Sequence, residues 1–205
     1  IILAAGQSSR MKSIKPILKI GEKASILWII DTFRTAGIDD INVVTGYHSD
    51  EIESVIKSHN VKIIKNNCPQ YGMFSSVKKG LEALGSDKIG FFIIPADMPM
   101  VKVQTINKII EKIDINEMQL IMPSFLNKNG HPLFVSSHFF DEILSMDLES
   151  NLRDLLSKYS DFKYIVPCAD NGIVMDMDFP KDYEAMVKYY ESREFPDLDE
   201  CQAMM

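Results

Sequence analysis

The chain opens with Ile1-Ile2-Leu3-Ala4-Ala5-Gly6-Gln7-Ser8-Ser9-Arg10-Met11, and Lys15-Pro16 follows shortly after. An apolar run ends here in two alanines and a glycine, and hydroxyl and cationic side chains come directly behind it. This order is typical of a buried strand that runs into an anion-binding loop. Small residues let a ligand approach the backbone, while N–H groups, arginine and lysine neutralise phosphate. The spacing matches neither G-x-G-x-x-G nor G-x-x-x-x-G-K-[ST], which leaves another kind of nucleotide loop or an ordinary α/β loop.

Beyond this stretch, short apolar runs alternate with helical patterns. The runs show little polar alternation, as in strands covered on both faces, and they lie at 1–4, 41–45, 61–65, 89–94 and 119–122. The helical patterns lie between them at 25–35, 49–57, 73–84 and 101–112. Strands that alternate with helices predict an α/β fold with a doubly wound, mostly parallel, Rossmann-like sheet. The ligands of such a sheet bind beyond the carboxyl ends of its strands.

The regular alternation breaks after residue 122. Segments 125–130 and 132–135 flank the turn-rich Asn127-Lys128-Asn129-Gly130 and predict a small β-hairpin insertion. Further helices are expected near 137–145, 151–158 and 181–191, and further strands at 162–166 and 173–177. We expect one domain over 1–191. The tail, 192–205, either docks on that domain or starts a further one.

Composition narrows the class of protein. The 205 residues carry a formal charge of −7, which argues against general nucleic-acid or anionic-membrane binding but allows a nucleotide held by a few local cations. Cys68, Cys168 and Cys201 lack paired metal-ligand spacing, so we interpret them as reduced thiols of a cytoplasmic protein. No apolar run reaches membrane-spanning length, and the apolar start is short and lacks the cationic lead of a signal peptide.

Carboxylates follow two of the predicted strands. Asp97 comes directly after the apolar run 91–96, and Asp176 and Asp178 end the segment 173–177, where a period of two points both to one side. A lone carboxylate at a buried strand end favours a metal or cation partner, and Mg²⁺ prefers a couple of carboxylates plus phosphate oxygens. The alternative is an Asp97 that merely caps the following helix.

Two other segments carry polar groups near predicted element ends. Gly72, Ser75 and Ser76 surround a helix start, where free N–H groups and hydroxyls bind an anion or a base edge, or simply cap the helix. Gly130-His131 offers an imidazole to a substrate, although a lone histidine is more often structural. The sequence gives no convincing Ser/His/Asp order and no activated cysteine.

Taken in order, these segments resemble the MobA-like NTP transferase family, and within it the MocA-type molybdenum cofactor cytidylyltransferases. The family's opening L-A-A-G-x-S-x-R-M-G-x-x-K is similar to residues 3–15, with Lys12 in place of the second glycine. The family's G-M-x-x-S, G-D-Q-P, G-H-P and D-I-D-T-P are similar to Gly72-Met73-Phe74-Ser75-Ser76, Ala96-Asp97-Met98-Pro99, Gly130-His131-Pro132 and Asp176-Met177-Asp178-Phe179-Pro180. The resemblance covers about residues 1–190.

The resemblance implies a nucleotidyltransferase domain that moves CMP from CTP to molybdopterin, or its metal-loaded form, and releases pyrophosphate. The Ala4-Ala5 pair, in place of the alanine and glycine of guanylyl-transferring relatives, favours CTP over GTP. Mg²⁺ is the implied cofactor, and an apo-molybdoenzyme is a further candidate partner.

The resemblance also assigns roles to residues. Arg10, Lys15 and Asp97 would be catalytic, with both cations on the triphosphate, and Asp97 and Asp178 would hold Mg²⁺. Gly130 and His131 would face the acceptor. The nucleotide would be bound by Leu3, Ala4, Ala5, Gly6, Ser8, Ser9, Arg10, Lys15, Gly72, Ser75 and Ser76.

Two other functions stay open at this point. A nucleotidyltransferase of the same fold can use a sugar phosphate or another phosphate as acceptor. A non-catalytic molybdenum cofactor carrier or maturation chaperone would bind the pterin and ignore nucleotides. The combination of Arg10, Lys15, Asp97 and Asp178 favours catalysis, because a carrier has no need of both carboxylates.

Overall fold

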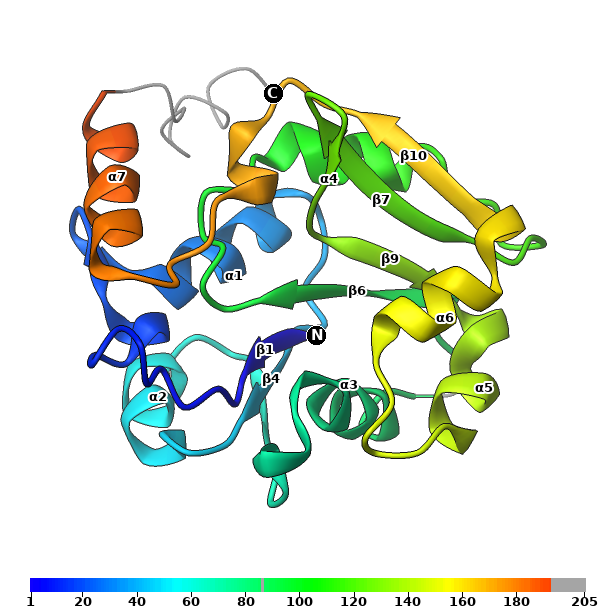
Figure 1. The fold of residues 1–205 in the computed structure, drawn as a ribbon, viewed down its shortest axis with the longest axis horizontal. Coiled ribbons are helices and arrows are strands. Elements are labelled where there is room, and N and C mark those ends of the chain that lie inside the picture. Colours follow the sequence, from blue (N-terminus) through cyan, green and yellow to red (C-terminus); the bar gives the residue numbers. More distant parts are fainter. Residues whose placement is uncertain (86, 193–205) are drawn as a thin grey trace.

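A mixed sheet crosses the middle of the molecule, with helices on both faces (Figure 1). The computed structural model describes residues 1–85 and 87–192, so the prediction for the tail falls almost wholly outside the described residues. In spatial order the strands are β10 (Lys163–Pro167), β7 (Leu120–Phe125), β9 (Leu133–Ser136), β6 (Gly90–Pro95), β1 (Ile2–Ala4), β4 (Asn42–Thr45) and β5 (Lys62–Lys65), and β8 (Lys128–Asn129) pairs with β7.

The strand directions confirm the predicted α/β, doubly wound, mostly parallel sheet. Along the order above, every pair is parallel except the two made by β9, which runs antiparallel to β6 and β7. The chain builds β1, β4 and β5 outward in one direction and then crosses to place β6 on the other side of β1. Open α/β sheets bind ligands at such a reversal, beyond the carboxyl ends of the strands.

Successive residues of the central strands enter opposite cores. Ile2 and Phe92 pack in one hydrophobic cluster, whereas Leu3 and Phe91 pack in the other. Since neighbouring strand residues point to opposite faces, both faces of the sheet are covered. This burial explains why the strands are continuous apolar runs without polar alternation.

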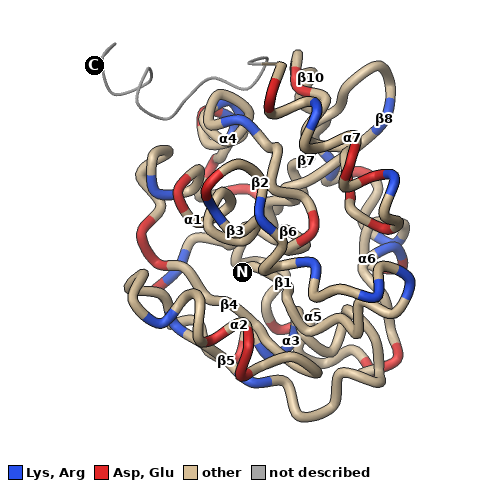
Figure 2. Tube along the Cα trace, turned by 90° about the vertical axis from the view of Figure 1, so that its left-hand side faces the viewer, with Lys and Arg blue, Asp and Glu red and all other residues tan. Residues whose placement is uncertain are grey.

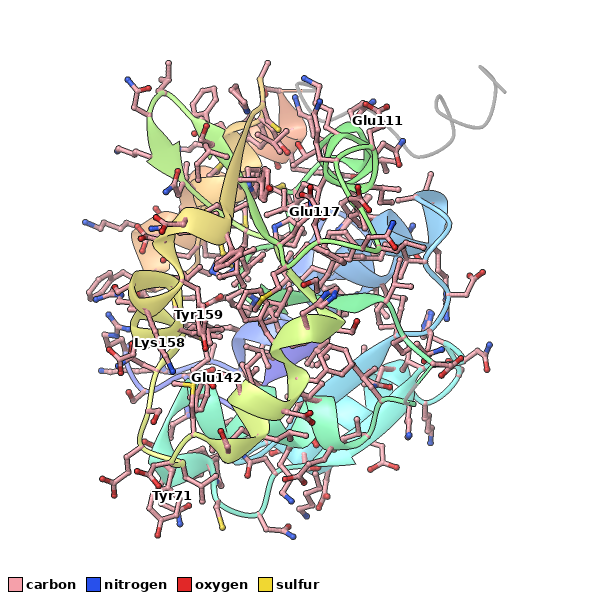
Figure 3. All side chains as sticks on the ribbon, turned by 90° about the vertical axis from the view of Figure 1, so that its right-hand side faces the viewer. Tyr71, Glu111, Glu117, Glu142, Lys158 and Tyr159 are labelled. Carbon is pink, nitrogen blue, oxygen red and sulfur yellow. The ribbon has the colours of Figure 1, made fainter. Side chains whose placement is uncertain are left out.

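Six helices of the described chain cover the two faces of the sheet. The first cluster includes residues of α1 (Ser25–Thr35), α2 (Ser49–Ile56) and α4 (Val103–Ile110), and the second includes residues of α3 (Met73–Glu82), α5 (Phe140–Ser145) and α6 (Leu152–Lys158). At the surface, Lys158 Nζ lies 2.5 Å from Glu142 Oε1 and 5.1 Å from the centre of the Tyr159 ring (Figure 3). This contact joins the end of α6 to α5.

The predicted hairpin exists, but its arms differ from those expected. Its turn is formed by Leu126 and Asn127, with positive φ values of 47° and 63°, and it joins β7 to β8. Two consecutive positive-φ residues give the tight turn whose twist suits a hairpin. The expected second arm, 132–135, enters the main sheet as β9 instead, because its side chains fill both cores, with Phe134 in one and its two neighbours in the other.

The predicted strand at 173–177 is wrong. Asn171–Val174 form a short 3-10 helix, η5, and the chain after it is irregular. Gly172 lies so close to the backbone of Met100 that an added Cβ would overlap the Met100 carbonyl. This contact holds Ile173 and Val174 beside the end of the sheet. Because no strand forms here, the two-residue period of a strand does not orient Asp176 and Asp178.

A separate unit lies where the N-terminal loop meets the last helix. The strands β2 (Lys19–Ile20) and β3 (Lys23–Ala24) form a hairpin that the sequence patterns did not indicate. The last helix, α7 (Pro180–Glu191), packs on α1 through Tyr190 and Trp28, whose ring centroids are 5.2 Å apart. The unit therefore joins the last helix of the described chain to α1 and the hairpin before it.

The surface carries charges of both signs. Lys and Arg alternate with Asp and Glu along the trace on the side shown in Figure 2. Within 1–85 and 87–192, none of the helices combines the length and the apolar character needed to span a membrane.

Candidate active site

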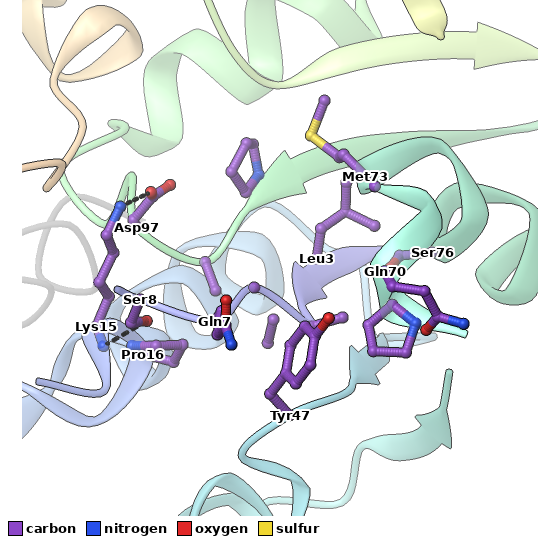
Figure 4. Close-up of a pocket in the computed structure, with 17 residues that line it drawn as sticks. Leu3, Gln7, Ser8, Lys15, Pro16, Tyr47, Gln70, Met73, Ser76 and Asp97 are labelled. Atoms are coloured by element: carbon purple, nitrogen blue, oxygen red, sulfur yellow. Dashed lines mark hydrogen bonds and ion pairs between the residues drawn. The ribbon is translucent and has the colours of Figure 1, made fainter. Parts of the chain in front are cut away.

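The carboxyl ends of β1, β4, β5 and β6 meet at one edge of the sheet and surround a cavity of about 400 Å³. The strands are parallel, so the residues that follow each of them gather at this edge. The cavity is lined by Leu3, Ala4, Ala5, Gly6, Gln7, Ser8, Lys15, Pro16, Tyr47, Pro69, Gln70, Gly72, Met73, Ser76, Pro95, Ala96 and Asp97. Figure 4 shows these side chains and backbone segments around the opening.

The loop after β1 is held in shape by its own hydrogen bonds. Ser8 and Lys12 both adopt positive φ, at 51° and 54°. Ser8 Oγ accepts from the Lys15 N–H at 3.4 Å, and the Ser25 hydroxyl donates to the Lys15 carbonyl at 2.8 Å. The backbone of Lys15 is thus fixed on both sides, which aims its side chain into the site.

Lys15 lies between two carboxylates that are far apart in sequence. Its Nζ is 3.0 Å from Asp97 Oδ2 and 2.8 Å from Asp178 Oδ1, and only 12% of its side chain is exposed. The two carboxylates therefore converge on a single cationic group at one end of the cavity.

Arg10 binds Asp178 from the solvent side. Its NH1 lies 2.8 Å from Asp178 Oδ2 and its NH2 lies 3.1 Å from Oδ1, which is a bidentate pair. The guanidinium also covers the Phe179 ring, 5.4 Å from its centre. Arg10 is mostly exposed, and it does not line the cavity.

These contacts change the ionisation of the site. Burial opposes the charged form of Lys15, but hydrogen bonds and charges from Asp178 and Asp97 outweigh it and raise its pKa. The hydrogen bond from Lys15, followed by the Lys15 and Arg10 charges, lowers the pKa of Asp178 in spite of partial desolvation. Desolvation, with the neighbouring charges of Asp178 and Asp97, raises the pKa of Asp176. The Lys15–Asp178 pair is therefore ionised at neutral pH.

Oxygen donors of this kind suit a divalent ion. The ammonium of Lys15 already lies within 3.0 Å of both Asp97 and Asp178, so the two carboxylates can reach a common cation. Within 1–85 and 87–192, no group of three or more His, Cys, Asp or Glu side chains could hold a metal alone. Two carboxylates supplemented by phosphate oxygens are the set that Mg²⁺ prefers, so the residues present fit that ion.

The opposite end of the cavity is less charged. In Figure 4, Gln70, Met73 and Ser76 lie across the opening from Lys15 and Asp97, with Leu3 between the two ends. One end of the cavity is thus charged, and the other offers a mostly apolar surface with a few polar groups.

Most of the predicted nucleotide-binding residues line this cavity, and some do not. Ser9 and Arg10 lie outside it on the exposed loop. Ser75 is buried, and its hydroxyl donates to the Gly72 carbonyl at 2.7 Å. Those that line it are Leu3, Ala4, Ala5, Gly6, Ser8, Lys15, Gly72 and Ser76.

Gly130 and His131, predicted to face the acceptor, make contacts with the protein itself. A Cβ at Gly130 would overlap the carbonyl of Ile173, and the His131 N–H donates to that carbonyl at 3.0 Å. The His131 Nδ1 lies 3.3 Å from the Ile93 carbonyl, and burial lowers the pKa of the ring. Neither residue lines the cavity, so their role toward an acceptor stays a prediction.

Sequence reasoning missed Tyr47, Gln70 and Asn66. Tyr47 comes two residues after the end of β4, with Gly46 between them, and it lines the cavity. Its position just after a predicted strand is the feature of the sequence that could have identified it. Gln70 sits in a short 3-10 turn whose position no pattern reveals. Asn66, directly after β5, is buried and donates to the hydroxyls of Ser75 and Ser76 at 2.8 and 3.0 Å.

A model of the MobA-like NTP transferase domain matches residues 1–162. Among curated proteins, the bifunctional protein GlmU of Chromohalobacter salexigens is 26% identical over 133 residues, which make up 64% of this chain and 29% of that protein. The chain thus spans less than a third of the length of that relative.

Two solved structures share the fold. A nucleotidyl transferase from Methanothermobacter thermautotroptrophicus matches with a TM-score of 0.82 at 19% identity, over 94% of this chain and 97% of that one. The CTP:phosphocholine cytidylyltransferase LicC from Streptococcus pneumoniae matches with a TM-score of 0.69 at 16% identity, over 92% and 97% of the two chains.

Proposed function

Because the chain belongs to the MobA-like NTP transferase family, we propose that it transfers CMP from CTP to a molybdopterin-type acceptor and releases pyrophosphate. One observation carries the nucleotidyl-transfer part. Lys15, held between Asp97 and Asp178, lies at the end of a cavity that the small residues of the β1 loop line. The choice of CTP and of the acceptor is supported by the motif resemblance and, for CTP, by the shared fold with a cytidylyltransferase.

The triphosphate would lie at the Lys15 end of the cavity. An oxygen of the acceptor phosphate attacks the α-phosphorus, and the bond from that phosphorus to the bridging oxygen breaks. Pyrophosphate leaves with the electron pair. Such a transfer needs alignment and charge neutralisation more than covalent help. Lys15 supplies a fixed positive charge, and the backbone around Gly6 offers N–H groups to the nucleotide.

Asp97 and Asp178 are the residues that would hold Mg²⁺. When bound, the ion offsets the negative charge on the reacting phosphates. Arg10 keeps Asp178 in place through its bidentate contact, and the Ser25 hydroxyl donates a hydrogen bond to the backbone carbonyl of Lys15. Arg10 thus orients the carboxylate of Asp178, and Ser25 fixes the backbone from which the Lys15 side chain extends.

Pyrophosphate release from CTP in the presence of molybdopterin and Mg²⁺ tests the proposal. Asp97→Asn should lower this rate by about 10²–10³-fold, the loss typical of a fixed electrostatic contact to the transition state. Asp39→Asn, at an exposed position away from the cavity, is the matched control and should keep full activity. Full activity of Asp97→Asn would remove Asp97 from the metal site.

The same assay separates the alternatives. Turnover with GTP instead of CTP would change the donor but leave the class of reaction intact. An absence of pyrophosphate release with every nucleotide and acceptor, together with tight molybdopterin binding in calorimetry, would favour a carrier. Residues Gly130 and His131 are proposed at the acceptor side, so substitutions there should change the apparent KM for the acceptor and not for the nucleotide.

A second candidate acceptor is an alcohol phosphate or a sugar phosphate. The shared fold with a phosphocholine cytidylyltransferase and the sequence similarity to GlmU favour it. Phosphocholine and a sugar 1-phosphate therefore belong in the acceptor panel. Turnover with one of them, and none with molybdopterin, would establish this alternative.

A further inference from the structure

We propose that Asn66 is a positioning residue that fixes the Ser76 hydroxyl as a hydrogen-bond donor into the cavity, and that this donor binds an acceptor atom on the edge of the nucleobase. The inference rests on the proposed function, because it assigns a ligand group to one end of the same cavity. It adds a residue that belongs to none of the motifs above and acts through a neighbour.

The orientation of the Asn66 side-chain amide is set by the backbone. Its Oδ1 accepts from the Cys68 N–H at 2.9 Å, and a backbone N–H can only donate. The Nδ2 group must therefore be the one that faces Ser75 Oγ at 2.8 Å and Ser76 Oγ at 3.0 Å. Both hydroxyl oxygens accept from Asn66, so each hydroxyl hydrogen must point elsewhere.

The two hydroxyls differ in where that hydrogen goes. Ser75 donates to the Gly72 carbonyl at 2.7 Å, with the Cys68 carbonyl 3.3 Å away. Among the described residues no group accepts the hydrogen of Ser76, although this residue lines the cavity. Asn66 and Ser76 are both 2% exposed. The Ser76 hydrogen is thus left for an acceptor in the cavity, at a position sheltered from bulk water.

The position of Ser76 selects the ligand group. Figure 4 shows Ser76 and Gln70 across the opening from Lys15, where the anionic end of a nucleotide belongs. Leu3 and Met73 contribute apolar surface between the two ends. A base that lies there presents carbonyl oxygens and ring nitrogens at its edge, and a hydroxyl donor pairs with one of them.

The test measures the affinity of CTP with Mg²⁺ by calorimetry for a cycle of variants. Asn66→Asp keeps the shape but offers oxygen atoms, so Ser76 donates to residue 66 and no longer to the base. We expect about three- to tenfold weaker CTP binding, the usual effect of one hydrogen bond. Ser76→Ala should weaken binding by a similar factor, and Asn66→Asp should add no further loss in the Ser76→Ala background.

Two controls separate this role from a structural one. Ser136→Ala should leave the affinity for CTP unchanged, because Ser136 is 2% exposed like Ser76 but lies in β9 and does not line the cavity. Inorganic triphosphate with Mg²⁺, which has no base, should bind Asn66→Asp as it binds the parent chain. A charge effect of the new carboxylate would instead weaken triphosphate binding as well.

The outcomes are distinct. The inference is overturned if Asn66→Asp binds CTP normally, or if its loss persists unchanged in the Ser76→Ala background. If Asn66→Asp fails to fold, the comparison of Ser76→Ala with Ser136→Ala decides, and equal CTP affinities overturn the inference. A parent chain that binds none of CTP, GTP, UTP and ATP would overturn the proposed function, and the inference with it.

Discussion

The backbone N–H of Met177 donates to the carbonyl of Asp97 at 3.2 Å. This bond fastens the irregular segment after η5 to the loop after β6. Asp178, the next residue, is thereby brought beside Asp97, and both carboxylates reach Lys15. This main-chain contact between distant parts of the chain thus helps to bring the two carboxylates together on Lys15.

Gly6→Ala tests whether a ligand lies against the loop after β1. A Cβ at Gly6 would meet no protein atom within 4 Å, so we expect the free energy of unfolding to change by less than about 0.5 kcal/mol. CTP affinity should fall by about tenfold or more, since a displaced nucleotide loses its alignment. Calorimetry and urea denaturation measure the two effects. Unchanged CTP affinity would place the nucleotide away from this loop.

Gly46→Ala is the contrasting variant for that experiment. Its Cβ would lie 2.7 Å from the Ala5 carbonyl, so the β1 and β4 ends must move apart. We expect the free energy of unfolding to fall by about 1–3 kcal/mol, as overpacking does. An unchanged free energy of unfolding for Gly46→Ala would mean that the ends of β1 and β4 can move apart at little cost.

Lys12→Gly should stabilise the protein. Lys12 adopts a φ of 54°, which costs a residue with a side chain roughly 1–2 kcal/mol. The added chain entropy of glycine offsets about 0.5–1 kcal/mol of that relief. Urea denaturation should therefore show a net gain of about 0.5–1 kcal/mol, whereas the β-branched Lys12→Val should show a loss.

Lys19→Gly is the matched control for Lys12→Gly. Lys19 is also exposed, but it lies in the extended strand β2, where glycine brings only its entropic cost. A loss of stability in both glycine variants would show that the conformation of Lys12 is not strained.

Asp178→Asn should reveal the ion pair through its pH dependence. The pKa of Asp178 is lowered in the folded protein, so its pairing adds stability above the unfolded pKa of about 3.9 and loses it as the pH falls through the folded value. The difference in free energy of unfolding between the parent and Asp178→Asn should be constant from pH 5 to 7 and shrink below about pH 4.

Urea denaturation between pH 3 and pH 7 measures this difference in the free energy of unfolding, with Asp39→Asn as the control at an exposed position. A difference that stays the same down to pH 3 would mean that Asp178 is not held by Lys15 and Arg10 in solution.

The sequence alone predicts those residues of the site that come soon after a strand. Lys15 and Asp97 could be brought together because the loops after β1 and β6 share an edge in any parallel sheet. Strand periodicity predicts the placement of Asp178 only if residues 173–177 form a strand, and they form none. The contact of Gly172 with Met100 and the Met177–Asp97 bond place it instead.

Other features depend on contacts that no local pattern carries. The strand β9 pairs with β6 and β7 because Phe134 and its neighbours fill two cores at once, which is a property of the whole sheet. Asn66 is a single polar residue after a short strand, and its importance follows from hydrogen bonds to a helix later in the chain.

The bidentate contact of Arg10 and the position of Lys15 between two carboxylates affect how the fold depends on a metal. Two counter-ions of the chain itself balance the acidic pair, Asp97 and Asp178. If Asp97 and Asp178 hold Mg²⁺ as proposed, removal of the ion by a chelator should therefore stop nucleotidyl transfer and leave the free energy of unfolding nearly unchanged, because Lys15 and Arg10 still neutralise the two carboxylates.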